Sequence, residues 1–139
     1  MMRTTLAGLL LLSGLVWADQ TQFDFANGLF QRGFYQEAAD EYKAYIEQNP
    51  QGEHVAVALY RLGESAYAAH DYAAALEAFD QATKRGLDPD TRQRASLSRA
   101  EVLYFLKRPA DAALALEPLT AKSVKPDLRG RALYYLGKV

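Results

Sequence analysis

Apolar positions recur along this chain with a helical period. Between Leu59 and Ala66 they fall at i, i+3, i+4 and i+7, which places them on one face of an α-helix. After a break at His70-Asp71, a second apolar face runs from Tyr72 to Ala82. The pattern predicts two antiparallel helices joined by a short turn, with Asp71 suited to cap the second helix.

This hairpin pattern repeats at an offset of 37 residues, with small residues recurring at small positions and large apolar residues at large ones. The small positions are Ala26, Gly63, Ala100 and Gly137 in the first helices, and Ala38, Ala75 and Ala112 in the second helices. A period of this length indicates stacked units that bury their apolar faces against their neighbours. We expect Gly63 and Ala75 to be small because two helix backbones approach closely there, with Phe79 filling the gap beyond.

The units are predicted at about residues 19–52, 53–88, 89–125 and, truncated, 126–139. In the first unit Phe25, Ala26 and Leu29 are expected to form the apolar face, followed by a turn at Gly33. Helix starts are predicted at Pro89, Pro109 and Pro126, because proline suits the first helical position.

The third unit is irregular, since Ser96 and Arg99 stand where the second unit has Leu59 and Leu62. Either the stem of Arg99 runs along the edge of the core, or the helix is slightly rotated. We expect this unit to be the least stable.

These residues resemble the tetratricopeptide repeat: a Leu-Gly pair and an aromatic residue, then Tyr, Ala, an aromatic residue and Ala. The resemblance is fullest from Ala58 to Ala82 and spans roughly residues 21–139. It implies an all-α fold, a right-handed α-solenoid of about three and a half helix-turn-helix repeats of 37 residues, and a role in protein binding. Units of this length are similar to those of bacterial periplasmic and outer-membrane-associated proteins.

The N-terminus has the layout of a secretory signal peptide. Arg3 precedes a mostly apolar stretch from Leu6 to Trp17, and Val16-Trp17-Ala18 suits a cleavage site. The apolar stretch is shorter than the roughly 20 residues that a membrane span needs, although an uncleaved anchor is the alternative. Residues 1–18 are therefore predicted to be a signal, residues 19–139 the repeat domain, and the location secreted or periplasmic.

Charge is unevenly distributed, although the net charge of the 139 residues is only −1. Residues 19–83 carry three basic and eleven acidic side chains, whereas residues 84–139 carry twelve basic and six acidic ones. This separation could steer a charged partner or favour head-to-tail association. The alternative is that these are ordinary solvated helix faces.

The sequence contains no recognisable catalytic motif. It has no cysteine, no phosphate-binding loop and only two histidines, His54 and His70, which we expect to be solvated at the surface. Glu101 near Arg94 or Arg99 is interpreted as a surface ion pair. We therefore predict a protein that is not an enzyme, with no catalytic residue, no metal site and no cofactor.

The resemblance implies that the first helix of each unit lines a concave inner face. Phe23, Tyr60, Leu97 and Tyr134 would form one column, and Phe30, Tyr67 and Tyr104 a second, with polar residues between them and Val57, Arg94 and Arg131 beside them. The predicted partner-binding residues are Phe23, Asn27, Phe30, Tyr60, Glu64, Tyr67, Arg94, Glu101 and Tyr104. Such a face suits a protein or peptide partner, unless its aromatic residues merely pack between adjacent units.

Three functional hypotheses remain open at this point. The first is a secreted scaffold, and the second is the N-terminal recognition module of a larger envelope enzyme or assembly-machine subunit truncated at residue 139. The second hypothesis arises because 132–137 repeats 58–63 and leaves Leu133 and Leu136 poorly covered. This suggests further C-terminal repeats, and the alternative is that this helix docks on another molecule. The third is self-association. Nucleic acid is disfavoured by the signal and the acidic N-terminal half, and a membrane would be contacted only through an uncleaved signal.

Overall fold

The computed structural model describes residues 20–139, so the predicted signal peptide lies outside the described residues. Within that range the chain is built from helices and short turns, without a β-strand. The first helix covers residues 20–31. It is followed by α2 (Tyr35–Gln48), α3 (Val55–Ala68), α4 (Tyr72–Thr83), α5 (Pro89–Phe105), α6 (Pro109–Leu116), the 3-10 helix η1 (Glu117–Thr120) and α7 (Pro126–Leu136).

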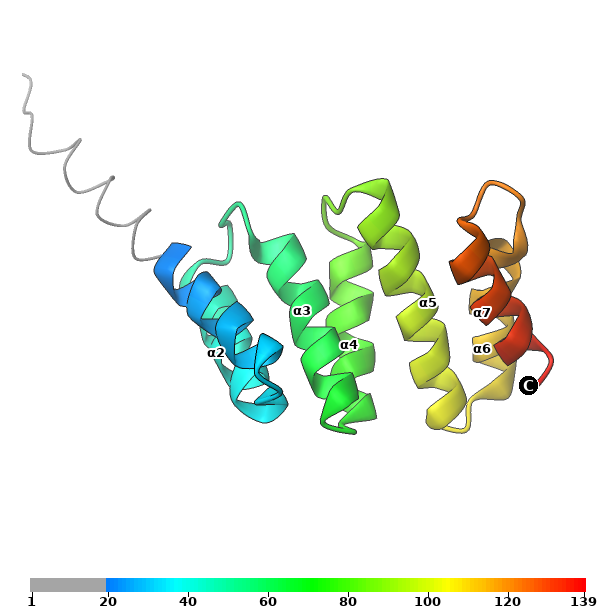
Figure 1. The fold of residues 1–139 in the computed structure, drawn as a ribbon, viewed down its shortest axis with the longest axis horizontal. Coiled ribbons are helices and arrows are strands. Elements are labelled where there is room, and N and C mark those ends of the chain that lie inside the picture. The colour runs from blue at the N-terminus through cyan, green and yellow to red at the C-terminus, as the bar shows by residue number, and fades with distance from the viewer. Residues whose placement is uncertain (1–19) are drawn as a thin grey trace, which may run out of the picture.

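The helices form hairpins that stand side by side along the long axis of the molecule (Figure 1). The helix over 20–31 precedes α2, α3 pairs with α4, and α5 pairs with α6. Helix α3 also packs against α2, and α5 also packs against α4 and α7, so that each hairpin contacts the next one. The predicted all-α helical-repeat solenoid is confirmed.

Helix starts and turns follow local signals in the sequence. The Asp71 carboxylate accepts a hydrogen bond from the backbone N–H of Ala74, so the predicted cap is present. The prolines at 89, 109 and 126 each open a helix, as expected. Capping and a preset φ angle therefore fix where the hairpins begin.

The turns inside the three hairpins share one backbone geometry. Gly33, His70 and Lys107 follow one another at the repeat spacing and have positive φ angles of 82°, 63° and 59°. In each turn the next N–H donates to the carbonyl five residues earlier, as Asp71 does to Ala66, which is the Schellman ending of a helix. Only the first turn has the glycine that this conformation favours.

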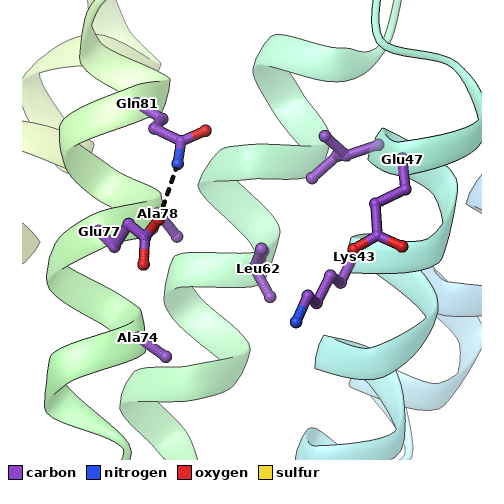
Figure 2. Close-up of a pocket in the computed structure, with 8 residues that line it drawn as sticks. Lys43, Glu47, Leu62, Ala74, Glu77, Ala78 and Gln81 are labelled. Atoms are coloured by element: carbon purple, nitrogen blue, oxygen red, sulfur yellow. Dashed lines mark hydrogen bonds between the residues drawn. The ribbon is translucent and has the colours of Figure 1, made fainter.

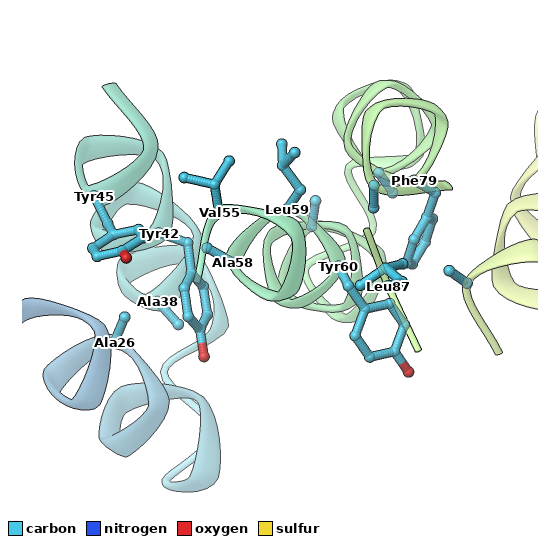
Figure 3. Packing of buried hydrophobic residues seen from close by; sticks show 14 of the residues in the cluster. Ala26, Ala38, Tyr42, Tyr45, Val55, Ala58, Leu59, Tyr60, Phe79 and Leu87 are labelled. Atoms are coloured by element: carbon cyan, nitrogen blue, oxygen red, sulfur yellow. The ribbon is translucent and has the colours of Figure 1, made fainter. Parts of the chain in front are cut away.

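The core lies where a bulky side chain of a second helix meets a small residue of a first helix. Tyr42, Phe79 and Leu116, which occupy equivalent positions, are fully buried. Figure 3 shows Tyr42 beside Ala26 of the helix over 20–31. A Cβ atom built on Gly63 would lie 2.6 Å from the Phe79 ring. The atoms nearest to Gly63 therefore belong to the Phe79 ring, the side chain that was expected to fill the space beside this residue.

Two other expectations about the apolar faces need revision. Phe25 is 56% exposed on the outer side of its helix, and Phe23 takes the core position instead. Arg99 is half-buried and its guanidinium pairs with Asp80 of α4, which agrees with a stem that runs along the edge of the core. No helix in residues 20–139 combines the length and apolar character needed to cross a membrane.

We predict that Gly63→Ala destabilises the protein by about 1–3 kcal/mol, because the new methyl group overpacks the Phe79 ring. Gly130→Ala in α7 is the matched control, since nothing lies within 4 Å of a Cβ at that position. The control should stabilise the protein by about 0.5–1 kcal/mol through helix propensity alone. Urea unfolding of both variants measures this, and equal effects of the two changes would contradict the proposed contact.

Candidate functional site

A groove of about 580 Å³ runs across the first helices of the array. Its walls come mainly from the helix over 20–31, α3, α5 and α7, with Tyr35 and Phe79 contributed by second helices. Six of the predicted partner-binding residues line it: Phe30, Tyr60, Glu64, Tyr67, Arg94 and Glu101. The stack of hairpins therefore brings together residues that lie far apart in the sequence.

A smaller hollow of about 280 Å³ adjoins the groove, and Phe30 lines both. Two further predicted residues, Phe23 and Asn27, lie in this hollow together with Val57 and Arg61. The remaining predicted residue, Tyr104, lines neither space. Its ring packs edge-on against Tyr135 of α7 at a centroid distance of 5.4 Å. The candidate site therefore extends over two connected hollows and leaves Tyr104 at its margin.

The first predicted aromatic column lies mostly in the core, and of its members only Tyr60 also lines the groove. Phe23 and Tyr60 are only 8% and 7% exposed, and Leu97 is buried as well. Phe23 is held by the rings of Tyr42, Tyr45 and His54. Of this column only Tyr134 is open, at 60% exposure. Because Phe23 and Tyr60 are almost fully buried, they have little surface with which to contact a partner.

The polar row between the columns is ordered by hydrogen bonds. The Tyr42 hydroxyl donates to Asn27 Oδ1 over 2.6 Å, which links the two helices of the first hairpin. The Tyr60 hydroxyl donates to one oxygen of Glu64 at 2.6 Å, and Arg61 donates to the other at 2.8 Å. These side chains therefore present a fixed pattern of charge and hydrogen-bonding groups.

Glu101 is not part of a surface ion pair with Arg94 or Arg99, as the sequence suggested. It is only 1% exposed, and its Oε1 accepts a hydrogen bond of 2.6 Å from Nη2 of Arg131 in α7. Burial raises the pKa of Glu101, and the neighbouring Arg131 guanidinium opposes that rise. Spacing along α5 could not identify Arg131 as the partner of Glu101, because Arg131 belongs to α7, which follows α6 and η1 in the chain.

Two arginines, Arg94 and Arg131, line the groove, and Arg94 is the one without a carboxylate partner among the described residues. Glu101 and Arg131 are separated by 30 residues, and so are Glu64 and Arg94 in the preceding repeat. In that repeat, however, Glu64 pairs with Arg61 of its own helix. Among the ion pairs of residues 20–139, none involves the exposed Arg94. Its guanidinium is therefore available to an anionic group.

The tyrosines of the groove act as neutral hydroxyl groups. Burial raises the pKa of Tyr67 to about 12, and burial together with the hydrogen bond to Glu64 raises that of Tyr60 further. At physiological pH both hydroxyls stay protonated, and the proton of Tyr60 is the one donated to Glu64. They are unsuited to act as bases.

An aromatic cluster near the hairpin turns was missed by the sequence reasoning. Tyr72 and Phe105 stack with centroids 5.1 Å apart and planes at 8°, and Tyr67 packs edge-on against both. Tyr135 extends the cluster to α7. The recurrence of Tyr35 and Tyr72 at the repeat spacing was a usable signal. This cluster holds Tyr67 at one end of the groove.

A second cavity, of about 340 Å³, lies between the second helices α2 and α4 (Figure 2). Leu62 of α3 lies between the two walls, and Gln81 donates a hydrogen bond of 3.3 Å to Glu77 at one side. This cavity is smaller than the groove and contains no aromatic side chain. The groove therefore offers a partner more varied contacts.

The two histidines differ in their surroundings. His70 is exposed in its turn, as expected, whereas His54 is half-buried and stacks on Phe23 at 5.0 Å. The ring of His54 also makes a hydrogen bond of 2.9 Å with Gln20. Over residues 20–139 no three His, Asp or Glu side chains lie close enough together to hold a metal ion.

Stacked helical hairpins with a groove along their first helices define a helical-repeat protein. The family model of the tetratricopeptide repeat matches residues 23–90 and 60–123, which together cover more than half of the chain. The chain therefore belongs to the tetratricopeptide repeat family, whose repeats generally mediate protein–protein interactions. No curated protein matches the chain at a significant level.

The buried carboxylate gives a prediction for the pH dependence of stability. Because the folded-state pKa of Glu101 is raised above its ordinary value of 4.5, the folded protein loses stability as the pH rises from 4.5 through the folded-state pKa. Glu101→Gln removes this loss, so the variant should gain stability over the wild type between pH 4 and pH 8. Thermal unfolding across this range measures the difference.

Glu117→Gln, at an exposed position in η1, is the control for that experiment and should leave the pH profile of stability unchanged. An E101Q protein that is less stable than the wild type at neutral pH would show that the ion pair with Arg131 outweighs the burial of the carboxylate.

Proposed function

We propose that this chain is a non-enzymatic scaffold that binds a protein partner through the groove of its first helices. The proposal rests on one observation above all. Rings from Phe30 and Tyr67, the carboxylate of Glu64 and the unpaired guanidinium of Arg94 line a single groove built across three hairpins. Apolar area combined with a few placed charges is what a peptide-binding surface needs.

An extended segment of a partner fits this arrangement best. Its apolar side chains would pack on the half-buried rings, while an acidic side chain would meet Arg94 and backbone N–H groups would donate to tyrosine hydroxyl oxygens. Helices, not loops, carry the lining residues, so little conformational entropy is lost on binding. The groove is therefore suited to recognition and has no arrangement of groups for covalent chemistry.

The test starts from peptides selected against the purified protein from a random library, with affinities measured by calorimetry. Tyr67→Ala and Arg94→Ala should each weaken binding on the order of tenfold, because aromatic and arginine side chains carry much of the energy of such interfaces. Leu114→Ala, an exposed leucine of α6 outside the groove, is the control and should bind like the wild type.

Circular dichroism and thermal unfolding must show that the Tyr67→Ala protein is folded, since Tyr67 packs against Tyr72 and Phe105. Folded groove variants that keep full affinity, or a control that loses as much as they do, would exclude the groove as the binding site.

We further propose that the scaffold acts outside the cytoplasm, in the periplasm or in secreted form, like the bacterial envelope proteins that its long repeats resemble. The support is the apolar leader from Leu6 to Trp17 and its cleavage pattern at Val16-Trp17-Ala18. The mature protein is expected to begin at Asp19. Intact-mass measurement and N-terminal sequencing of protein from the periplasmic fraction test this, and a cytoplasmic protein that retains Met1 would contradict it.

A further inference from the structure

The two end helices of the described array each present an uncovered apolar side chain. Phe25 is 56% exposed on the helix over 20–31, and Leu133 is 53% exposed on α7 beside the open Tyr134. The equivalent residues inside the array are covered: Leu59, which corresponds to Leu133, is buried, and Leu62, which corresponds to Phe25, is half-buried. Both end helices therefore expose apolar positions that are covered by neighbouring helices inside the array.

Open space accompanies these side chains. Inside the array, the Phe79 ring fills the space beside Gly63. A Cβ on Gly137, the equivalent residue of α7, would meet only backbone atoms of its own helix, and Gly28 and Gly130 have nothing within 4 Å. Each end helix thus has a protruding apolar side chain and, about one turn away, a glycine beside open space. Helices pack by fitting such ridges into the grooves of a neighbour.

The two ends also carry opposite charge. Residues 20–54 contain six acidic and two basic side chains, whereas residues 106–139 contain seven basic and three acidic ones. Contact between two α7 helices would bring like charges together, and so would contact between two N-terminal ends. Contact between an N-terminal end and an α7 end is the only pairing of the two ends that brings unlike charges together.

We propose that these faces are covered by a second copy of this chain, stacked head to tail so that α7 of one copy packs against the helix over 20–31 of the next. The contact is heterologous, because two different faces meet, and it can therefore repeat along a row of copies. This association uses the ends of the array and leaves the groove of the first helices free, so it is independent of the proposed partner binding.

The first measurement is the molar mass of the purified protein in solution, by sedimentation or light scattering, over a range of protein and salt concentrations. We expect dimers and longer rows at low salt that dissociate as salt screens the opposite charges. Phe25→Gln and Leu133→Gln remove the two apolar contacts without changing the charge and keep good helix formers in place. Each should raise the dissociation constant at least about tenfold.

Mixing the two variants separates head-to-tail stacking from other arrangements. Phe25→Gln keeps an intact α7 face and Leu133→Gln keeps an intact N-terminal face, so a mixture has one complete contact and should form mixed dimers that grow no further. Leu114→Gln, at an exposed leucine of α6, is the control and should associate like the wild type. Circular dichroism verifies that all variants are folded.

Three results would overturn the proposal. The first is a monomer at every salt and protein concentration, which would leave the two faces to another segment or another protein. The second is association that neither Phe25→Gln nor Leu133→Gln weakens. The third is a mixture of the two variants that remains monomeric, because a head-to-tail contact requires that mixture to pair.

Discussion

The contact between a bulky buried side chain and a small residue of the facing helix holds the hairpins of this array together. The Phe79 ring lies directly on Gly63, and Tyr42 lies beside Ala26 of the helix over 20–31 (Figure 3). The same residues also reach the functional face: the Tyr42 hydroxyl bonds Asn27, and Phe79 contacts the ring of Tyr60 and lines the groove. Packing within the hairpins therefore sets the positions of the first helices, and through them the shape of the groove.

The electrostatic character of the groove follows from how successive hairpins meet. Glu101 is buried because α7 packs across α5, and Arg131 arrives with that helix to pair with it. One repeat earlier, Arg61 takes the equivalent carboxylate, Glu64. The glutamate and the arginine 30 residues later therefore form an ion pair in one repeat, Glu101 with Arg131, but not in the other, Glu64 with Arg94. Such differences between repeats allow a regular scaffold to hold a distinctive arrangement of charges.

Helices, turns and caps could be predicted from the sequence because their signals are local: apolar spacing, the Asp71 cap and the three prolines. Which of two neighbouring side chains faces the core could not. Phe23 and Phe25 are two residues apart, and only packing against Tyr42 and His54 decides that Phe23 is the buried one. The groove residues were largely identified by their repeat spacing, whereas the burial of Glu101 and its partner depend on helices distant in the sequence.

A repeat array differs from a globular domain in that its stacking surface does not close on itself. Each hairpin inside the array is covered by a neighbour on either side. Leu59 is buried in this way, whereas Leu133, its equivalent in α7, is open. Burying apolar area is favourable wherever it occurs, but it gives no preference among possible partners. In the head-to-tail stacking that we propose, direction would come from charge, because the acidic first hairpin of one copy would attract the basic last helices of the next. The separation of charge along the sequence would then select which end of one copy meets which end of the next.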